Sequence, residues 1–333
     1  MLDFNLFPVD NNGVRHFGWA GPTEAKDAWA KVKNNFDPFK LEGKAKKKSK
    51  TKTSGNASAL RKRFIWEVVR KVAGKDLLNY PQQAGSCVSE AARSCCNYLA
   101  ATQILLEKKA EGFKESYAPY HYSTMRTLVA PKHGTRFGCS EDGGIGSYMA
   151  ESFSEYGNLF ADIPGLEEYT GQASIARKWG CYQPKKEFIL EGQKHLVKKV
   201  ARITSWEDYV DAISNGYPIH FCSMLSWNMK PDSNGFHSQS REGWAHALAH
   251  ISVDDEYKDP YCEILNSWGD CHGQLKNFYT QEALPVGIIR SKKSVIAREL
   301  ERDDVEAFAL SDMDGFYERK SEIDKALFDL FGT

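Results

Sequence analysis

The spacing of hydrophobic side chains changes partway along this chain of 333 residues, and that change constrains the fold most strongly. In the first half, apolar residues recur at intervals of three and four, which is typical of helices that bury one face. In the second half, short runs rich in β-branched and aromatic residues predict strands instead. Helices first and strands later predict an α+β protein in which the two kinds of element occupy separate parts. We expect helices at 61–73, 87–107 and 145–156, and strands at 196–203, 218–227, 245–253, 262–266 and 286–290.

Both ends of the chain lack this core-forming pattern. Residues 1–59 are interpreted as an N-terminal arm with a short helix at 23–33 and a linker, because the Lys-rich stretch Lys44–Lys52 has no apolar periodicity. At the other end, residues 318–333 place four apolar side chains on one face of a helix, so we expect this helix to dock onto another surface. The main domain is therefore expected at 60–317.

Composition argues against several classes of protein. The 44 basic and 44 acidic residues cancel, so the chain as a whole is not built to coat nucleic acid or an anionic membrane. Lys44–Lys52 alone is basic enough for a weak contact with nucleic acid, although a plain solvated tether is the simpler interpretation. No apolar stretch approaches 18 residues, and the start at Met1 lacks a signal-peptide pattern. We therefore expect no membrane segment and synthesis in the cytoplasm.

The eight cysteines are too sparse to form a disulfide scaffold. Without a signal peptide, reduced thiols are the expectation, and most of these side chains should be small buried hydrophobes. No Cys-x-x-Cys pair occurs, and Cys271-His272 lacks the spacing of zinc ligands. We therefore expect no metal site and no cofactor.

One cysteine stands at the start of a predicted helix. Cys87 follows the turn at 82–86 and begins the helix expected at 87–107. The first turn of a helix has unpaired N–H groups and the positive end of the helix dipole, and both favour a thiolate over a thiol. Cys87 is therefore a candidate nucleophile.

Two later segments carry residues that suit a nucleophilic cysteine. The strand expected at 245–253 holds His246 near its start, and Asn266 ends the next strand, two residues before Trp268. His250 lies four residues after His246, which puts both on the same face of a strand, so periodicity alone does not choose between them.

In these segments the sequence resembles the papain-like cysteine peptidases. The order Cys, His, Asn is that of the family, and His246 and Asn266 lie 159 and 179 residues after Cys87. The sequence Asn-Ser-Trp-Gly at 266–269 is the most specific motif. The Gly-rich turn at 138–144 looks like the turn beside the family's substrate groove.

The resemblance implies a two-lobed papain-like fold, of the divergent type carried by bacteria and bacteriophages, over roughly residues 75–317. A helical lobe would span about 75–170 and include the nucleophile helix. A second lobe, built on an antiparallel barrel-like sheet, would span about 171–317. The substrate groove would run near Gly143, Gly144 and Ala247.

The resemblance also implies an acyl-transfer mechanism that cuts amide bonds in a protein or peptide substrate, with no cofactor. Cys87 would attack as a thiolate, His246 would move the proton, and Asn266 would orient the imidazole. Trp268 would keep water away from the contact between the histidine and the asparagine. The oxyanion would be bound by the backbone N–H of the nucleophile and by a side-chain amide, that of Gln82 or Gln83.

Several positions depart from the family pattern. Pro81 stands where the oxyanion glutamine usually lies, and Val88 replaces the aromatic residue that commonly follows the nucleophile. Glu90, one helical turn after Cys87, would oppose thiolate formation unless it has a partner of its own. Residues 270–272, Asp-Cys-His, stand where the family has a second Trp-Gly.

These departures keep open a second class of function, a papain-fold binding or assembly protein with weak or no catalysis, such as a component of a bacteriophage virion. The arm at 1–59 and the helix at 318–333 would then contact other copies of the chain or virion partners. A cell-wall amidase is a third interpretation, because such enzymes share the Cys-before-His order, but the motif Asn-Ser-Trp-Gly argues against it.

Overall fold

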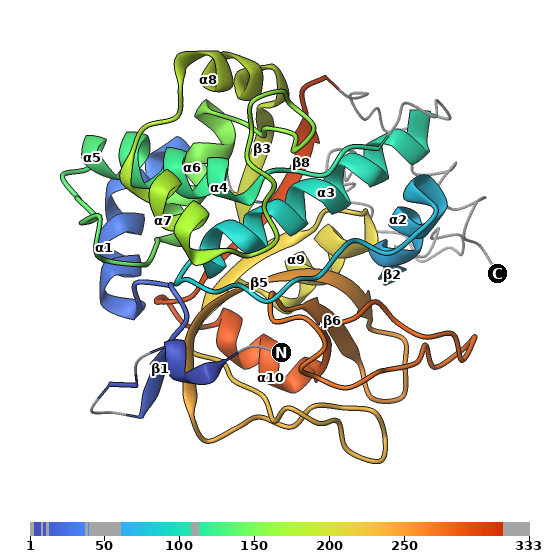
Figure 1. Cartoon of the computed structure of the whole chain (residues 1–333). Coiled ribbons are helices and arrows are strands. Elements are labelled where there is room, and N and C mark those ends of the chain that lie inside the picture. The colour runs from blue at the N-terminus through green and yellow to red at the C-terminus, as the bar shows by residue number, and fades with distance from the viewer. Residues whose placement is uncertain are drawn as a thin grey trace, which may run out of the picture.

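A long buried helix, α3 (Cys87–Glu107), runs through the middle of the molecule (Figure 1). Ala92 and Leu99 of this helix are fully buried, because other elements surround it. The computed structural model describes residues 3–7, 9–10, 13–36, 39, 61–107 and 113–315. The linker expected at Lys44–Lys52 and the helix expected at 318–333 lie outside these described residues.

Short helices gather around α3 and form the helical lobe (Figure 1). They are α1 (Pro22–Val32), α2 (Ile65–Ala73), α4 (Ala118–Ser123), α5 (Ala130–Lys132), α6 (Gly146–Glu155), α7 (Ala173–Cys181) and α8 (Lys186–Gly192). A π-helical segment at Thr124–Val129 joins α4 to α5. Single 3-10 turns occupy Phe4–Leu6, Lys33–Asn35 and Gln193–His195. Two further helices pack with the strands instead, α9 (Trp206–Ser214) and α10 (Lys293–Leu300).

The second lobe is built on a sheet centred on the long strand β5 (Gly243–Asp254). The strand order is β3-β8-β4-β5-β6-β7, and every neighbouring pair along this path is antiparallel. Two short strands also pair with β5, β2 in antiparallel and β1 in parallel orientation. The remaining bounds are β1 (Val14–His16), β2 (Lys62–Phe64), β3 (Val197–Arg202), β4 (Ile219–Ser223), β6 (Tyr261–Leu265), β7 (Ile288–Lys292) and β8 (Glu306–Met313).

The predicted α+β class is confirmed, because the molecule has a helical lobe and a second lobe built on an antiparallel sheet. The strand expected at 218–227 ends early, at Ser223, whose hydroxyl accepts a hydrogen bond from the backbone N–H of Leu225 and so turns the chain. Strand β8 was not expected, because Glu306 and Asp312 interrupt its apolar pattern although both side chains are buried.

The N-terminal segment at 13–36 packs into the body of the molecule, which differs from the tethered element expected from the sequence. Phe17 and Trp19 are only 0% and 2% exposed, and β1 lies beside the start of β5. Helix α1 contacts α6, and its buried side chains are Ala25, Ala28 and Val32. Burial of these apolar groups removes their surface from water, which stabilises the docked position of the segment.

Cys139 and Cys181 form a disulfide, so the expectation of reduced thiols is wrong for this pair. Their separation of 42 residues gives no signal in the sequence, and only the fold brings the loop at 138–144 to the end of α7. The other cysteines are free, and all of them except the half-buried Cys271 are buried.

Within the described part of the chain, no three His, Cys, Asp or Glu side chains are grouped as ligands for a metal ion. Among the same residues, every helix is too short or too polar to span a membrane.

Candidate active site

Cys87 is the first residue of α3 and lies against the start of β5. Its side chain is fully buried, and Sγ accepts a hydrogen bond of 3.3 Å from the backbone N–H of Ala247. The turn before it is held by the carbonyl of Ser86, which accepts from the backbone N–H groups of Ser89 and Glu90. The first turn of α3 therefore fixes the sulfur beside the residue that follows His246.

His246 contacts Asn266 through one of its two ring nitrogens. Nε2 lies 2.8 Å from Oδ1 of Asn266, and the backbone N–H of Ser267 donates to the same oxygen at 2.7 Å. Because a backbone N–H only donates, the atom facing it must be the amide oxygen, which fixes the orientation of the amide. Nε2 of His246 must then carry the proton. Among the residues that the structure describes, Nδ1 has no hydrogen-bond partner, so it is the nitrogen able to exchange a proton with a thiol.

Aromatic rings seal the contact between His246 and Asn266 from water. The fully buried ring of Trp268 stacks on the imidazole, with 4.8 Å between centroids and 21° between planes. The ring of Phe17 lies 4.3 Å from Trp268 and 5.1 Å from His246. Exclusion of water strengthens a polar contact, so these rings favour a single orientation of the imidazole.

Burial sets the charge states of Cys87 and His246. Desolvation raises the pKa of the Cys87 thiol well above its usual range, against a smaller lowering by the Ala247 N–H. Desolvation also lowers the pKa of His246 to about 3, against a smaller raising by Asn266. Both groups are therefore neutral at pH 7 while the site is covered.

Glu90 has the partners that the sequence analysis required. The carboxylate is buried, accepts a hydrogen bond from the hydroxyl of Tyr169, and lies close to the positive charge of Arg93. Burial raises its pKa, and the contacts with Tyr169 and Arg93 oppose that rise. These contacts hold the Glu90 carboxylate, although its charge still contributes to the raised pKa of the Cys87 thiol.

The structure separates the two candidate oxyanion glutamines. Gln82 is fully buried, and its Nε2 donates to the backbone carbonyls of Phe17 and Ala84, each at 2.9 Å. Its Oε1 accepts from the hydroxyl of Ser267 at 2.5 Å. The side chain of Gln83 is exposed instead. Gln82 is thus the glutamine at the site, and both of its N–H groups are occupied by backbone carbonyls.

The N-terminal segment 14–20 crosses the site between the two lobes. On one side, the N–H of Phe17 donates to the carbonyl of Ala245 at 3.0 Å. On the other side, the N–H of Gly144 donates to the carbonyl of Gly18 at 2.7 Å, and the N–H of Ala20 donates to the carbonyl of Gly144 at 2.9 Å. Gly144, one of the expected groove residues, thus pairs with the protein's own N-terminal segment in this structure.

Gly18 allows this crossing because it has no side chain. Its φ is +119°, and a Cβ placed on it would lie 2.1 Å from the carbonyl oxygen of Gly85. Gly21 has a similar φ of +110°, but a Cβ there would meet nothing closer than 3.5 Å. The close backbone approach at Gly18 is thus specific to the point where the segment passes the turn before Cys87.

Trp19 anchors the segment where the start of β8 meets the start of α6. Its Nε1 donates to Glu306 at 2.7 Å, and the same carboxylate accepts from the backbone N–H groups of Gly146 and Ser147 at 2.9 and 2.7 Å. These two N–H groups begin α6, where a helix favours a negative charge. Glu306 therefore both binds the indole of Trp19 and caps the start of α6.

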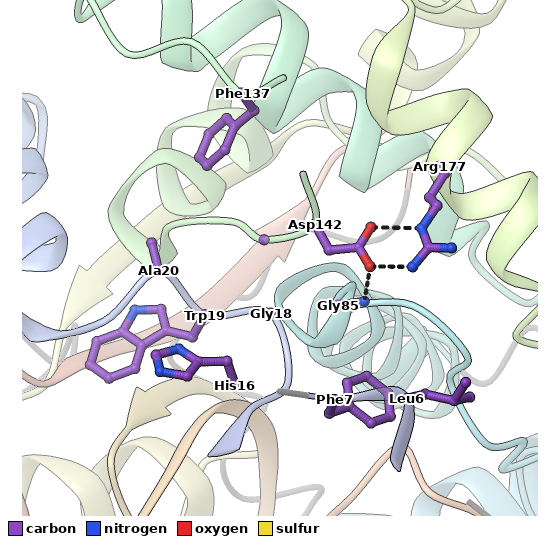
Figure 2. A pocket seen from close by; sticks show the side chains of 11 residues that line it. Leu6, Phe7, His16, Gly18, Trp19, Ala20, Gly85, Phe137, Asp142 and Arg177 are labelled. Carbon is purple, nitrogen blue, oxygen red and sulfur yellow. Dashed lines mark hydrogen bonds and ion pairs between the residues drawn. The ribbon is translucent and has the colours of Figure 1, made fainter. Parts of the chain in front are cut away.

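A cavity of about 410 Å³ remains between the segment and the helical lobe (Figure 2). Gly143, another expected groove residue, lines it together with Phe137. Asp142 accepts hydrogen bonds from Nε and Nη2 of Arg177 and from the backbone N–H of Gly85 (Figure 2). Asp142 thus ties the turn before Cys87 to α7. The third expected groove residue, Ala247, lies instead against the thiol.

Sequence reasoning missed the residues that cover and brace the site. Phe17 and Trp19 flank Gly18 in a segment interpreted as an arm, and the cluster Phe-Gly-Trp was the available signal. Ser267, which fixes the amide of Asn266, stood inside the recognised motif. His272, which also contacts Asn266, was noted only as a departure from the family pattern.

Comparisons by sequence and by structure give different results for this chain. No protein-family model and no curated protein matches the chain. Among solved structures, it is similar to xylellain, a cysteine protease from Xylella fastidiosa, with 12% identity, TM-score 0.48, and coverage of 83% of this chain and 94% of that one. It is also similar to proCathepsin B S9 from Trypanosoma congolense, with 10% identity, TM-score 0.48, and coverage of 83% and 82%. The digestive procathepsin L2 proteinase from the larval midgut of Tenebrio molitor has 12% identity, TM-score 0.48, and coverage of 90% and 78%.

Proposed function

We propose that this chain is a papain-like thiol hydrolase that cleaves peptide bonds, and that residues 14–20 cover its site in the resting form. The observation that carries the proposal is the arrangement around His246. Its Nε2 is fixed by Asn266, its Nδ1 is left unpaired, and the next backbone N–H contacts the sulfur of Cys87. A histidine oriented on one side and open on the other is what proton transfer from a thiol requires.

In the proposed reaction, Nδ1 of His246 takes the proton of the Cys87 thiol, and the thiolate attacks the carbonyl carbon of the substrate. The carbon–nitrogen bond then breaks, the imidazolium gives its proton to the leaving amine, and a thioester remains on Cys87. Water attacks this thioester after losing a proton to His246. The thiol leaves with that proton, and the products are a carboxylic acid and an amine.

The contact between Gln82 and Phe17 supports the oxyanion role proposed for Gln82. A backbone carbonyl oxygen, that of Phe17, already accepts a hydrogen bond from the side-chain amide beside the nucleophile. A substrate carbonyl would take the same donor as negative charge develops on its oxygen, which is worth about 3 kcal/mol for one such donor. Substrate and segment 14–20 would therefore compete for one place.

The alternative is a papain-fold assembly protein without catalysis, as in a virion. The observation that favours it is the complete burial of Cys87 together with the occupation of both N–H groups of Gln82. If segment 14–20 never leaves, the cleft is a structural joint rather than an active site.

The two candidates differ in what happens when the segment is displaced. Gly18→Ala places a methyl group against the Gly85 carbonyl, whereas Gly21→Ala adds the same methyl group at a similar φ without that clash. We would measure hydrolysis of dye-labelled, unfolded casein by the full chain carrying either change. An overpacking cost of 1–3 kcal/mol at the docked segment predicts about tenfold faster hydrolysis for Gly18→Ala than for Gly21→Ala.

The control is the double variant Gly18→Ala, Cys87→Ala, which should be inactive. A thioester trapped on Cys87 and seen by mass spectrometry would identify the nucleophile. Absence of hydrolysis in a folded Gly18→Ala chain, with its cleft shown open by faster backbone hydrogen exchange at β1, would contradict the enzyme and leave the assembly role.

A further inference from the structure

The side chain of Asn266 contacts two histidines, one at each end of its amide. Oδ1 lies 2.8 Å from Nε2 of His246, and Nδ2 lies 2.8 Å from Nε2 of His272. The Ser267 N–H fixes which end is the oxygen, so the group facing His272 is the NH₂ donor. Nε2 of His272 must therefore accept, and the proton of its neutral ring must lie on Nδ1.

The surroundings of His272 keep its ring neutral and in place. The residue is fully buried, and its ring lies 5.7 Å from that of Trp268 at an angle of 24°. The ionisable groups that face it are His237 and His246, and both of these rings oppose a further positive charge. Burial, with these two contributions, lowers the pKa of His272 to about 3. Its Nε2 is thus an acceptor at every pH at which the enzyme would work.

We propose that His272 is a positioning residue that holds Asn266 in the orientation needed by His246, which extends the three-residue site to four. This inference rests on the proposed function. The physical reason is the asymmetry of the amide. A rotation of half a turn would place NH₂ against the protonated Nε2 of His246 and against the Ser267 N–H, so two contacts would lose their acceptor. The acceptor on His272 stabilises the productive orientation and leaves no buried NH₂ unpaired.

The first test reads the tautomer directly. Long-range ¹H–¹⁵N correlation spectra of the full wild-type chain should show His272 with the proton on Nδ1 and His246 with the proton on Nε2 at neutral pH. A proton on Nε2 of His272 would overturn the proposal, because that ring could then not accept from Asn266. This measurement requires no activity, so it decides the positioning claim even if the chain proves not to be an enzyme.

The second test uses substitutions at His272 in the chain opened by Gly18→Ala. His272→Phe keeps an aromatic ring beside Trp268 but removes the acceptor, whereas His272→Gln restores a carbonyl acceptor. One lost hydrogen bond predicts a kcat lower by about tenfold for His272→Phe, with KM unchanged and with the pKa of Cys87 alkylation raised. His272→Gln should recover part of both effects.

His250→Phe is the matched control, because it also replaces a fully buried imidazole, but one that contacts Tyr209 rather than Asn266. It should leave kcat per folded molecule and the alkylation pKa unchanged. Equal effects of His272→Phe and His250→Phe, or no recovery with His272→Gln, would show that His272 acts only through stability and would overturn the proposal. If the parent chain hydrolyses nothing, the proposed function fails, while the tautomer still tests the hydrogen bond itself.

Discussion

The two halves of strand β5 each carry a buried histidine, and the two sites differ in the partners of the imidazole. His246 and His250 are 1% and 0% exposed, and burial lowers the pKa of each to about 3. Within the described part of the chain, neither Nδ1 of His246 nor Nε2 of His250 has a hydrogen-bond partner. Burial and titration therefore do not identify the catalytic candidate.

The contacts make the distinction. In the second half of β5, Nδ1 of His250 contacts the Tyr209 hydroxyl at 2.9 Å, and the imidazole stacks on the ring of Phe221 at 4.3 Å. In the first half of β5, Nε2 of His246 contacts the amide oxygen of Asn266, whose orientation is fixed. The residue after His246 contacts the sulfur of Cys87. A strongly shifted pKa thus marks a buried group, whereas the contacts with Asn266 and with the residue beside Cys87 are what distinguish His246.

The largest expected effect is on kcat/KM, which should depend on His246 but not on His250. In the chain opened by Gly18→Ala, His246→Ala should lower kcat/KM by about 10³-fold or more, because it removes the proposed general acid and base. His250→Ala should leave kcat/KM per folded molecule nearly unchanged and lower the free energy of unfolding by about 1–3 kcal/mol. Steady-state hydrolysis and urea unfolding measure the two quantities. Equal losses of activity for the two variants would break the distinction.

The next prediction concerns residues 14–20, which lie over only the start of β5. Trp19→Ala removes a buried indole and its bond to Glu306, which costs about 3–5 kcal/mol of docking energy. Alkylation of Cys87 by iodoacetamide should rise by about 10²-fold, read by peptide mass spectrometry. Cys262 is equally buried and pairs with Val253 in the second half of β5, so its alkylation should not change. A parallel rise at Cys262 would indicate general unfolding instead.

The smallest effect is one in which the two histidines should behave alike. Each neutral buried ring takes up a proton only near pH 3, whereas the unfolded chain does so near pH 6.5. The unfolded state thus binds more protons between these values, so stability is full above about pH 6.5 and falls as pH drops toward 3. His246→Gln and His250→Gln should each reduce this slope by up to about 1.4 kcal/mol per pH unit. A change for only one variant, in urea unfolding at several pH values, would contradict equal burial.

The sequence predicted those parts of the site that local patterns encode. The start of α3 at Cys87 and the end of β6 before Asn266 followed from spacing, turns and one motif. The alternation of side chains along a strand could not decide between His246 and His250. That choice depends on which part of β5 meets α3, and this is a long-range property of the fold. The resemblance, rather than the physics of the strand, favoured His246.

The N-terminal cover shows the opposite case. The segment containing Phe17 and Trp19 has little local pattern, and its burial comes from contacts with β5 and Gly144, far away in sequence. The disulfide between Cys139 and Cys181 was missed for the same reason. Sequence reasoning thus found the groups that would carry the chemistry, but not those that cover or brace them.

The pH dependence of Cys87 alkylation in the chain carrying Gly18→Ala tests the central claim most directly. If His246 serves Cys87 in the opened cleft, Cys87 should react rapidly well below pH 8, on a plateau that His246→Ala removes. A single rise with a pKa of about 8.5, the same with and without His246, would mean that Cys87 is an ordinary thiol and that no catalytic pair exists.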